Sequence, residues 1–125
     1  MYFLDTYAMI EYLKGTTEFV KIINTGEILT SDFQLMELYY YGLKDFDEDT
    51  AEKYYEAFSS ILINIPEKVL KNAMKKKLEL HKKKINISYV DAIGYQYAID
   101  HKMKFVTGDR SFKDLDPESV FYLGK

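Results

Sequence analysis

Four acidic residues are the side chains best suited to carry chemistry in this sequence: Asp5, Glu37, Asp91 and Asp109. Carboxylates that converge repel one another, and they stay ionised together only when cations lie between them. All-oxygen ligand sets select hard cations such as Mg²⁺ or Mn²⁺. Such ions polarise a phosphodiester and activate water for in-line attack. If the four acids meet in the fold, the pattern therefore favours metal-assisted hydrolysis of phosphodiester bonds.

Each of these acids also has a purely structural alternative. Asp5 suits the N-cap of the helix that follows it, and Asp109 suits a turn. The spacing from Ser88 to Asp91 is that of a capping box, although glutamate is the usual acid at that position. Glu37 is either exposed on its helix or partly buried with a partner, for which a metal is one candidate. The local sequence leaves these alternatives open.

Two short apolar runs position the first and last of these acids. Residues 2–4 come directly before Asp5, and Gly108 alone separates residues 103–107 from Asp109. The uninterrupted apolar run at residues 2–4 is typical of a strand that is buried on both faces of a parallel sheet, and residues 103–107 repeat the arrangement of a short apolar strand that ends near an acid. Ligands of open α/β sheets bind outside the carboxyl ends of the strands. The two acids therefore lie side by side if their strands are neighbours.

Strands and helices alternate along the whole chain. The predicted strands cover residues 2–4, 27–30, 62–65, 103–107 and 120–123, and the predicted helices cover residues 6–14, 16–26, 33–44, 50–61, 66–81 and 88–101. Asp49 or Thr50 is expected to cap the fourth helix. Gly94 indicates that the last helix packs closely against a neighbour, which would hold Asp91 near the sheet edge. We expect an α/β fold with one domain over residues 1–125, a mostly parallel central sheet of about four to five strands, and helices on both faces.

The composition excludes several classes of site. Cysteine is absent, which excludes disulfides, thiolate zinc sites and thiol nucleophiles. His81 lies in a lysine-rich helix and His101 at a helix end, so neither resembles the base of a catalytic triad, and no Gly-rich phosphate loop is present. No apolar run is long enough to cross a membrane, and the N-terminus does not resemble a signal peptide. We therefore expect a cytoplasmic protein without a membrane partner.

Four segments resemble the motifs of the PIN-domain ribonucleases and, within that family, of the VapC-type toxins of prokaryotic toxin–antitoxin pairs. These segments are Phe3-Leu4-Asp5-Thr6, Leu35-Met36-Glu37-Leu38, Ser88-Tyr89-Val90-Asp91-Ala92 and Phe105-Val106-Thr107-Gly108-Asp109-Arg110-Ser111-Phe112. They occur in the family's order and at its usual spacings over essentially the whole chain, and the last segment is the most specific.

The resemblance implies an acidic metal site, built from Asp5, Glu37, Asp91 and Asp109, that binds Mg²⁺ or Mn²⁺. It also implies endonucleolytic cleavage of RNA, a cognate antitoxin partner and a homodimer. Three further residues are expected near the site, two as hydroxyls and one as a cation that braces a carboxylate or contacts phosphate: Thr6, Thr107 and Arg110. The sequence departs from the family at Tyr7, where many relatives have serine or asparagine.

The charge distribution bears on RNA binding. The net charge of −3 argues against a non-specific nucleic-acid binder, but residues 67–84 hold eight lysines against two glutamates. Lysine-rich helices are most often solvated faces. The alternative is contact with the RNA backbone, for which the candidates are Lys75, Lys76, Lys77, Lys82, Lys83 and Lys84.

Three other functions fit parts of the pattern. A PIN nuclease that processes RNA without an antitoxin would carry the same acids. A catalytically silent PIN module that binds RNA or protein would keep the fold without the metal chemistry. A phosphoacceptor receiver domain also places an aspartate at a strand end, but it needs a lysine at the end of a late strand, and Lys104 is at the beginning of its strand.

Overall fold

The structure is a computed structural model that describes residues 1–124, and a five-stranded parallel sheet lies at its centre. The strand order is β3-β2-β1-β4-β5, and every pairing is parallel. The strands are β1 (Tyr2–Leu4), β2 (Ile28–Ser31), β3 (Leu62–Ile63), β4 (Lys104–Thr107) and β5 (Val120–Tyr122). The predicted mostly parallel sheet of four to five strands is therefore confirmed, with β1 in the middle and β4 beside it.

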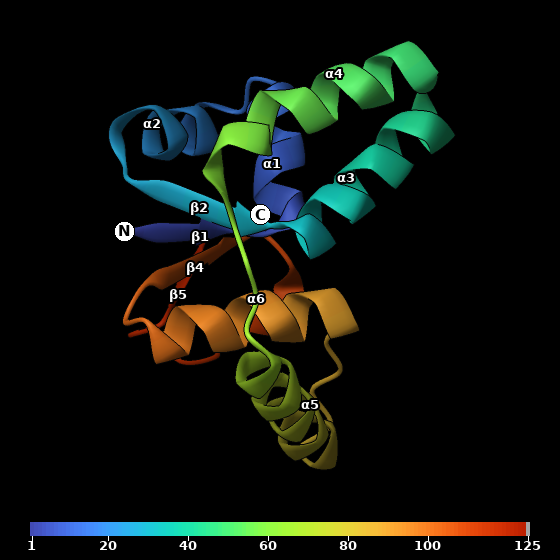
Figure 1. Ribbon diagram of the computed structural model, residues 1–125. Helices are drawn as coiled ribbons and strands as arrows, with labels where there is room; N and C mark the ends of the chain where they lie inside the picture. Colours follow the sequence, from blue (N-terminus) through green and yellow to red (C-terminus); the bar gives the residue numbers. More distant parts are fainter. Residues whose placement is uncertain (125) are drawn as a thin grey trace.

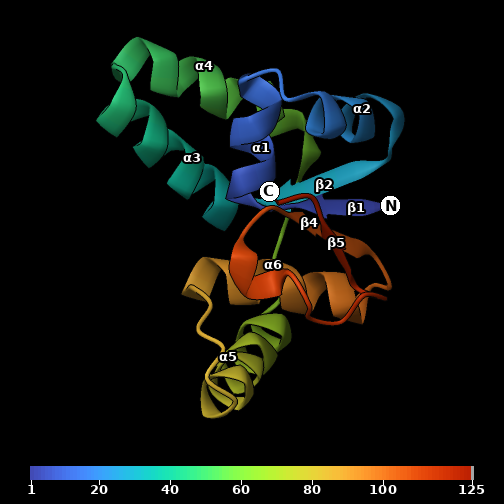
Figure 2. The same ribbon diagram turned by 180° about the vertical axis from the view of Figure 1, so that it is seen from behind.

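Helices cover both faces of this sheet, as Figures 1 and 2 show. On one face lie α1 (Thr6–Leu13), α2 (Thr17–Thr25), α3 (Asp32–Asp45) and α4 (Glu48–Phe58). On the other face α6 (Tyr89–Asp100) packs on the sheet and α5 (Glu67–Lys82) packs beneath α6. Two short 3-10 helices complete the fold, η1 (Ser59–Ile61) and η2 (Arg110–Phe112). Within residues 1–124 no helix combines the length and the apolar character that crossing a membrane requires.

The central strands divide their side chains between two cores. Phe3 and Phe105 belong to the core formed with α5 and α6, whereas Leu4 and Val106 belong to the core formed with α1 to α4. All four side chains are fully buried. Successive strand residues point to opposite faces, so the middle of a strand covered on both sides is apolar at consecutive positions. This explains the adjacent apolar residues Phe3-Leu4 and Phe105-Val106 in the sequence.

Serine side chains cap two of the helices, and the cap predicted for a third helix is wrong. Ser31 caps α3 and Ser88 caps α6, and each hydroxyl accepts a backbone N–H from the first turn of its helix. The cap of α4 is Asp47, whose Oδ1 accepts from the backbone N–H of Thr50 at 2.7 Å. Asp49 and Thr50 instead lie inside the first turn. Several neighbouring polar residues can cap this helix, and the sequence alone does not select among them.

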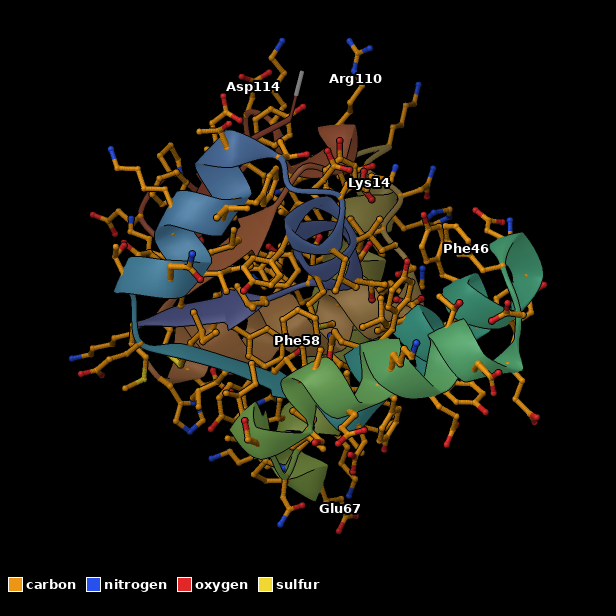
Figure 3. The ribbon with its side chains drawn as sticks, turned by 90° about the horizontal axis from the view of Figure 1, so that it is seen from above. Lys14, Phe46, Phe58, Glu67, Arg110 and Asp114 are labelled. Carbon is orange, nitrogen blue, oxygen red and sulfur yellow. The ribbon has the colours of Figure 1, made fainter. Side chains whose placement is uncertain are left out.

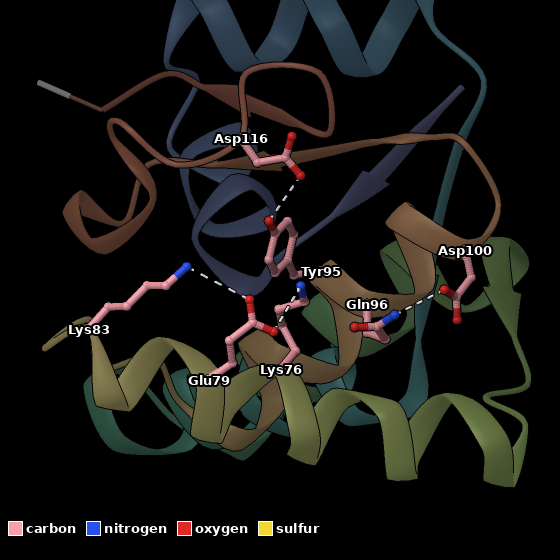
Figure 4. Close-up of polar contacts among 7 residues, drawn as sticks. All are labelled: Lys76, Glu79, Lys83, Tyr95, Gln96, Asp100 and Asp116. Atoms are coloured by element: carbon pink, nitrogen blue, oxygen red, sulfur yellow. Dashed lines mark hydrogen bonds and ion pairs between the residues drawn. The ribbon is translucent and has the colours of Figure 1, made fainter.

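Polar contacts tie α6 to a neighbouring loop and link side chains along α5 (Figure 4). The Tyr95 hydroxyl of α6 donates to Oδ2 of Asp116 at 3.0 Å, which ties the helix to the loop before β5. On α5, Glu79 pairs with Lys76 at 3.5 Å and with Lys83 at 3.8 Å. Lys71 likewise pairs with Glu67 at 3.0 Å, so three of the lysines in the basic segment are already partnered by an acid of the same helix.

Candidate active site

The four acids predicted from the sequence line one cavity of about 820 Å³. Asp5 follows β1 and Asp109 follows β4, and these strands are adjacent, with Leu4 opposite Val106. Glu37 reaches the cavity from α3, and Asp91 reaches it from the first turn of α6. The cavity therefore lies at the carboxyl edge of the sheet, where ligand sites of open α/β sheets are expected. Its other lining residues are Thr6, Tyr7, Ile10, Ser88, Gly108 and Arg110.

Asp5 combines both roles that the sequence left open. It is the N-cap of α1, and its Oδ1 accepts the backbone N–H of Ala8 at 2.7 Å. It also lines the cavity, with only 1% of its surface exposed. Burial, and then the charge of Asp91, raises the pKa of Asp5 well above its usual range, while hydrogen bonds from Thr107 and from Ala8 act in the opposite direction. A proton or a cation is needed to offset that buried charge.

Thr107 holds Asp5 and Asp109 together. The threonine is fully buried at the end of β4, and its Oγ1 accepts the backbone N–H of Asp109 at 3.0 Å. The same hydroxyl hydrogen-bonds the Asp5 carboxylate. Asp109 in turn caps η2, because its Oδ1 accepts the backbone N–H of Ser111 at 2.9 Å. The turn alternative for Asp109 is therefore correct, and the turn places the residue at the cavity.

Asp91 lies close enough to Asp109 and Glu37 for their charges to raise its pKa. Burial, then the charge of Asp109 and then that of Glu37 raise the pKa of Asp91 to about 7. The position depends on Gly94, where an added Cβ would lie 2.7 Å from the Phe3 ring. The predicted close packing of α6 on the sheet is thus confirmed, and this packing brings the helix N-terminus to the sheet edge.

Glu37 is partly buried and has a partner. Its Oε1 accepts the Thr6 hydroxyl at 2.6 Å, which fixes one carboxylate oxygen across the cavity from Asp91. Thr6 is therefore close to the site, as the resemblance implied. The alternative that Glu37 points freely into solvent is wrong.

Gln34 is a positioning residue that the sequence analysis missed. It is fully buried, its Nε2 donates to the carbonyl of Val90 at 3.0 Å, and its Oε1 accepts the Ser31 hydroxyl. It thereby ties the start of α3, which carries Glu37, to the start of α6. Ser31 and Gln34 have the spacing of a capping box, and this pattern could have identified the residue.

Arg110 lies at the rim of the cavity. Its side chain is exposed and extends outward from the edge of the molecule (Figure 3). Among residues 1–124 it forms no ion pair within 4.0 Å of a carboxylate. The structure therefore does not show it bracing an acid, and the contact with phosphate stays a prediction.

Tyr7, the departure noted in the sequence, lies in the wall of the cavity. Its ring packs against Phe19, with the centroids 5.9 Å apart, and lies directly over Gly108. An added Cβ at Gly108 would be 2.1 Å from the Tyr7 ring. The tyrosine fits because residue 108 has no side chain, and it forms an aromatic wall of the cavity.

The four acids are the right type of ligand for a hard divalent cation, but their side chains are too far apart to share one ion as they lie. As the side chains lie, no three acidic or histidine groups among the described residues are close enough to share one metal ion. All four acids nevertheless offer oxygen ligands, and the raised pKa values of Asp5 and Asp91 arise partly from neighbouring carboxylates. A cation would counteract that repulsion. Rotation of the side chains would be needed to bring the oxygens around one ion.

The predicted RNA-contacting lysines lie outside this cavity, on α5 and the loop that follows it. Lys77 donates to the carbonyl of Ile87, and Lys76 and Lys83 pair with Glu79. None of the six candidates lines the cavity: Lys75, Lys76, Lys77, Lys82, Lys83 and Lys84.

Comparison with known proteins identifies one family, and the solved structures that resemble this chain share its fold. The family model described as PIN domain matches residues 2–117. A chain of the VapBC2 complex from Rickettsia felis superposes with a TM-score of 0.77 at 20% identity, covering 98% of both chains. A chain of DNA-bound VapBC from Salmonella typhimurium gives 0.77 at 22% identity, covering 97% of this chain and 96% of that one. Mycobacterium tuberculosis VapC20, described as a sarcin-ricin loop cleaving toxin, gives 0.70 at 14% identity, covering 91% and 95%. No curated protein sequence matches the chain.

Proposed function

This chain belongs to the PIN domain family, and on that premise we propose that it is a metal-dependent endoribonuclease, the toxin of a VapBC-type toxin–antitoxin pair. The observation that carries the proposal is the convergence of four acids from four separate parts of the chain on one cavity: Asp5, Glu37, Asp91 and Asp109. A stable fold does not need such mutual repulsion, so the arrangement favours a function that uses it.

The chemistry proposed for the cavity is hydrolysis of an RNA phosphodiester. Asp5, Asp91 and Asp109 would hold Mg²⁺ or Mn²⁺, which supplies a Lewis acid and lowers the pKa of a bound water. Thr107 links the carboxylate of Asp5 to the backbone N–H of Asp109 through its two hydrogen bonds. These contacts keep Asp5 and Asp109 beside each other at the sheet edge before substrate arrives.

Glu37 would act as the general base that accepts a proton from the attacking water. Its Oε1 is held by Thr6, so the remaining oxygen, Oε2, is the one that can accept a proton in the cavity. Arg110, exposed at the rim, would attract the phosphate backbone towards the acids. The lysines of α5 would contact the RNA backbone farther from the scissile bond.

An antitoxin and a second copy of the chain are the proposed protein partners. The solved structures of similar fold include VapBC complexes from several bacteria, which supports an antitoxin. The hairpin of α3 and α4 exposes large apolar side chains that a partner would cover: Met36, Tyr40, Leu43, Phe46 and Tyr55. Phe46 lies at the outer end of this hairpin (Figure 3). We further propose that residues 1–125 form one domain and that the protein acts in the cytoplasm.

The proposal is tested by incubating the purified chain with cellular RNA in Mn²⁺ or Mg²⁺. Cleavage is expected in either metal, and its loss is expected with a chelator or after Asp5→Asn. Glu118→Gln removes one exposed carboxylate outside the cavity and should cleave normally. Unchanged cleavage by a folded Asp5→Asn protein would refute the site. Cleavage without any growth arrest on expression would favour an RNA-processing nuclease that has no antitoxin.

A catalytically silent binding module is the second candidate, because no three acids among residues 1–124 are close enough to hold an ion as they lie. The two candidates differ in their response to Mn²⁺. A nuclease should show a rise in melting temperature with millimolar Mn²⁺, whereas a silent module should show none.

A further inference from the structure

A second cavity, of about 480 Å³, lies between α5 and the start of α6, next to the candidate active site but separate from it. Its walls combine three apolar side chains with three polar ones: Met74, Leu78 and Tyr89 with Lys77, His81 and Asn86. The apolar side chains remain 37%, 53% and 66% exposed, respectively. Exposure of this kind at one place is a feature of binding grooves rather than of an ordinary surface.

Tyr89 is held in position within this groove. The Lys77 Nζ lies 4.7 Å from the centroid of the Tyr89 ring, and the same amino group donates to the backbone carbonyl of Ile87. The ring is therefore supported on one side by a cation whose own position is fixed. Because two-thirds of the residue is exposed, the ring still offers a large flat surface to a ligand.

The groove is joined to the active site by the chain itself. Tyr89 is the first residue of α6 and directly follows Ser88, which lines the cavity of the four acids. Asp91 is only two residues farther along the same turn. A nucleotide bound on Tyr89 would therefore neighbour the nucleotide whose phosphate reaches the carboxylates.

The charge beside the groove suits a polyanion. Lys76 and Lys83 are partnered by Glu79 (Figure 4), but Lys82 forms no ion pair within 4.0 Å among the described residues. Lys82 lies four positions after Leu78 and so extends the groove face by one helical turn. An apolar groove with an exposed aromatic ring and lysines at its edge matches the sites that bind single-stranded nucleic acids, where bases stack and cations follow the backbone.

We propose, on the premise of the ribonuclease function above, that this groove is a nucleobase subsite for single-stranded RNA. One base stacks on Tyr89 and packs against Met74 and Leu78, and the adjoining phosphate lies near Lys82. Stacking tolerates any base because every base has a flat π-face. The subsite would thus position a flanking nucleotide without selecting its sequence.

The test measures binding without cleavage, using a short fluorescein-labelled oligoadenylate in the presence of a chelator. Tyr89→Ala should weaken binding by about 5-fold or more, and Tyr89→Trp should preserve it. Leu78→Asn, which changes the opposite wall, should also weaken binding. A strand of the same length with abasic positions should bind Tyr89→Ala and the unaltered chain equally. Glu118→Gln, which changes an exposed side chain outside both cavities, serves as the control and should not change binding.

Three results would overturn the subsite. Binding of oligoadenylate unchanged in Tyr89→Ala would exclude stacking, and an equal loss with the abasic strand would show a general effect on phosphate binding. A dimer of the unaltered chain that Tyr89→Ala dissociates would show that the groove is a protein interface. Failure of the subsite and failure of the ribonuclease function give different results. If the unaltered chain cleaves RNA in Mn²⁺ but Tyr89→Ala binds oligoadenylate normally, only the subsite is rejected. If binding depends on Tyr89 but the unaltered chain does not cleave RNA, only the nuclease function is rejected.

Discussion

Replacing Asp91 by asparagine should stabilise the metal-free protein, and the gain should depend on pH. In the folded chain the pKa of Asp91 is raised from 3.8 to about 7, first by burial and then by Asp109 and Glu37. The folded state therefore keeps a proton that the unfolded state releases. The stability associated with that proton is fully present below pH 3.8 and is lost as the pH rises through about 7.

The size of the effect follows from the difference between the two pKa values. About three pH units correspond to about 4 kcal/mol of unfolding free energy once Asp91 is ionised. Asp91 is only partly buried and solvent screens its charge, so we expect about half of that, roughly 2 kcal/mol. Asparagine keeps a similar shape without the charge. Asp91→Asn should therefore gain roughly 2 kcal/mol over the unaltered chain at about pH 9, and almost nothing at about pH 4.

The assay is urea denaturation in a chelator at the two pH values, with Glu118→Gln as the matched control. Glu118 is exposed and outside the cavity, so its neutralisation should change the unfolding free energy little at either pH. Mn²⁺ should then favour the unaltered chain over Asp91→Asn, because only the former keeps the full set of carboxylates. The same pH dependence in Asp91→Asn and the unaltered chain would refute the described environment of Asp91.

Two further predictions concern residues around the acids. Gly108→Ala should lower the unfolding free energy by about 1–3 kcal/mol, because the new Cβ would lie 2.1 Å from the Tyr7 ring. The double variant with Tyr7→Ser should recover most of this loss in urea denaturation, and no recovery would exclude the clash as the cause. Thr107→Val removes the hydroxyl that hydrogen-bonds Asp5 and Asp109, and it should weaken Mn²⁺ affinity about 10-fold or more in a calorimetric titration. Unchanged affinity would show that Thr107 has only a packing role.

The sequence was sufficient for the elements that are decided locally. The strands β1 and β4 were predictable because both faces of each are covered, which favours consecutive apolar residues such as Phe3-Leu4 and Phe105-Val106. Gly94 indicated the close approach of α6 because only tight packing accounts for a glycine inside that helix. These two features were enough to place Asp5 and Asp91 at one edge of the sheet.

The remaining features depend on contacts between distant parts of the chain. That β1 and β4 are neighbours is a property of the topology, since about 100 residues separate them, and it decides that Asp5 and Asp109 share a cavity. Gln34 links α3 to α6 by a hydrogen bond across 56 positions; the local spacing from Ser31 marks the residue but not this partner. The position of Lys77 over the Tyr89 ring likewise depends on how α5 packs against α6. The sequence therefore indicated the acids and the nearby hydroxyls of Thr6 and Thr107, but not the long-range contacts of Gln34 and Lys77.

The most direct test of the central claim is a calorimetric titration of the metal-free chain with Mn²⁺. The account predicts saturable binding by the unaltered chain and by Glu118→Gln, and no saturable binding by Asp5→Asn, because the buried Asp5 carboxylate lies among the other acids of the cavity. Saturable binding that persists in a folded Asp5→Asn protein, or no binding by the unaltered chain at millimolar Mn²⁺, would contradict the claim that these carboxylates form a divalent metal site.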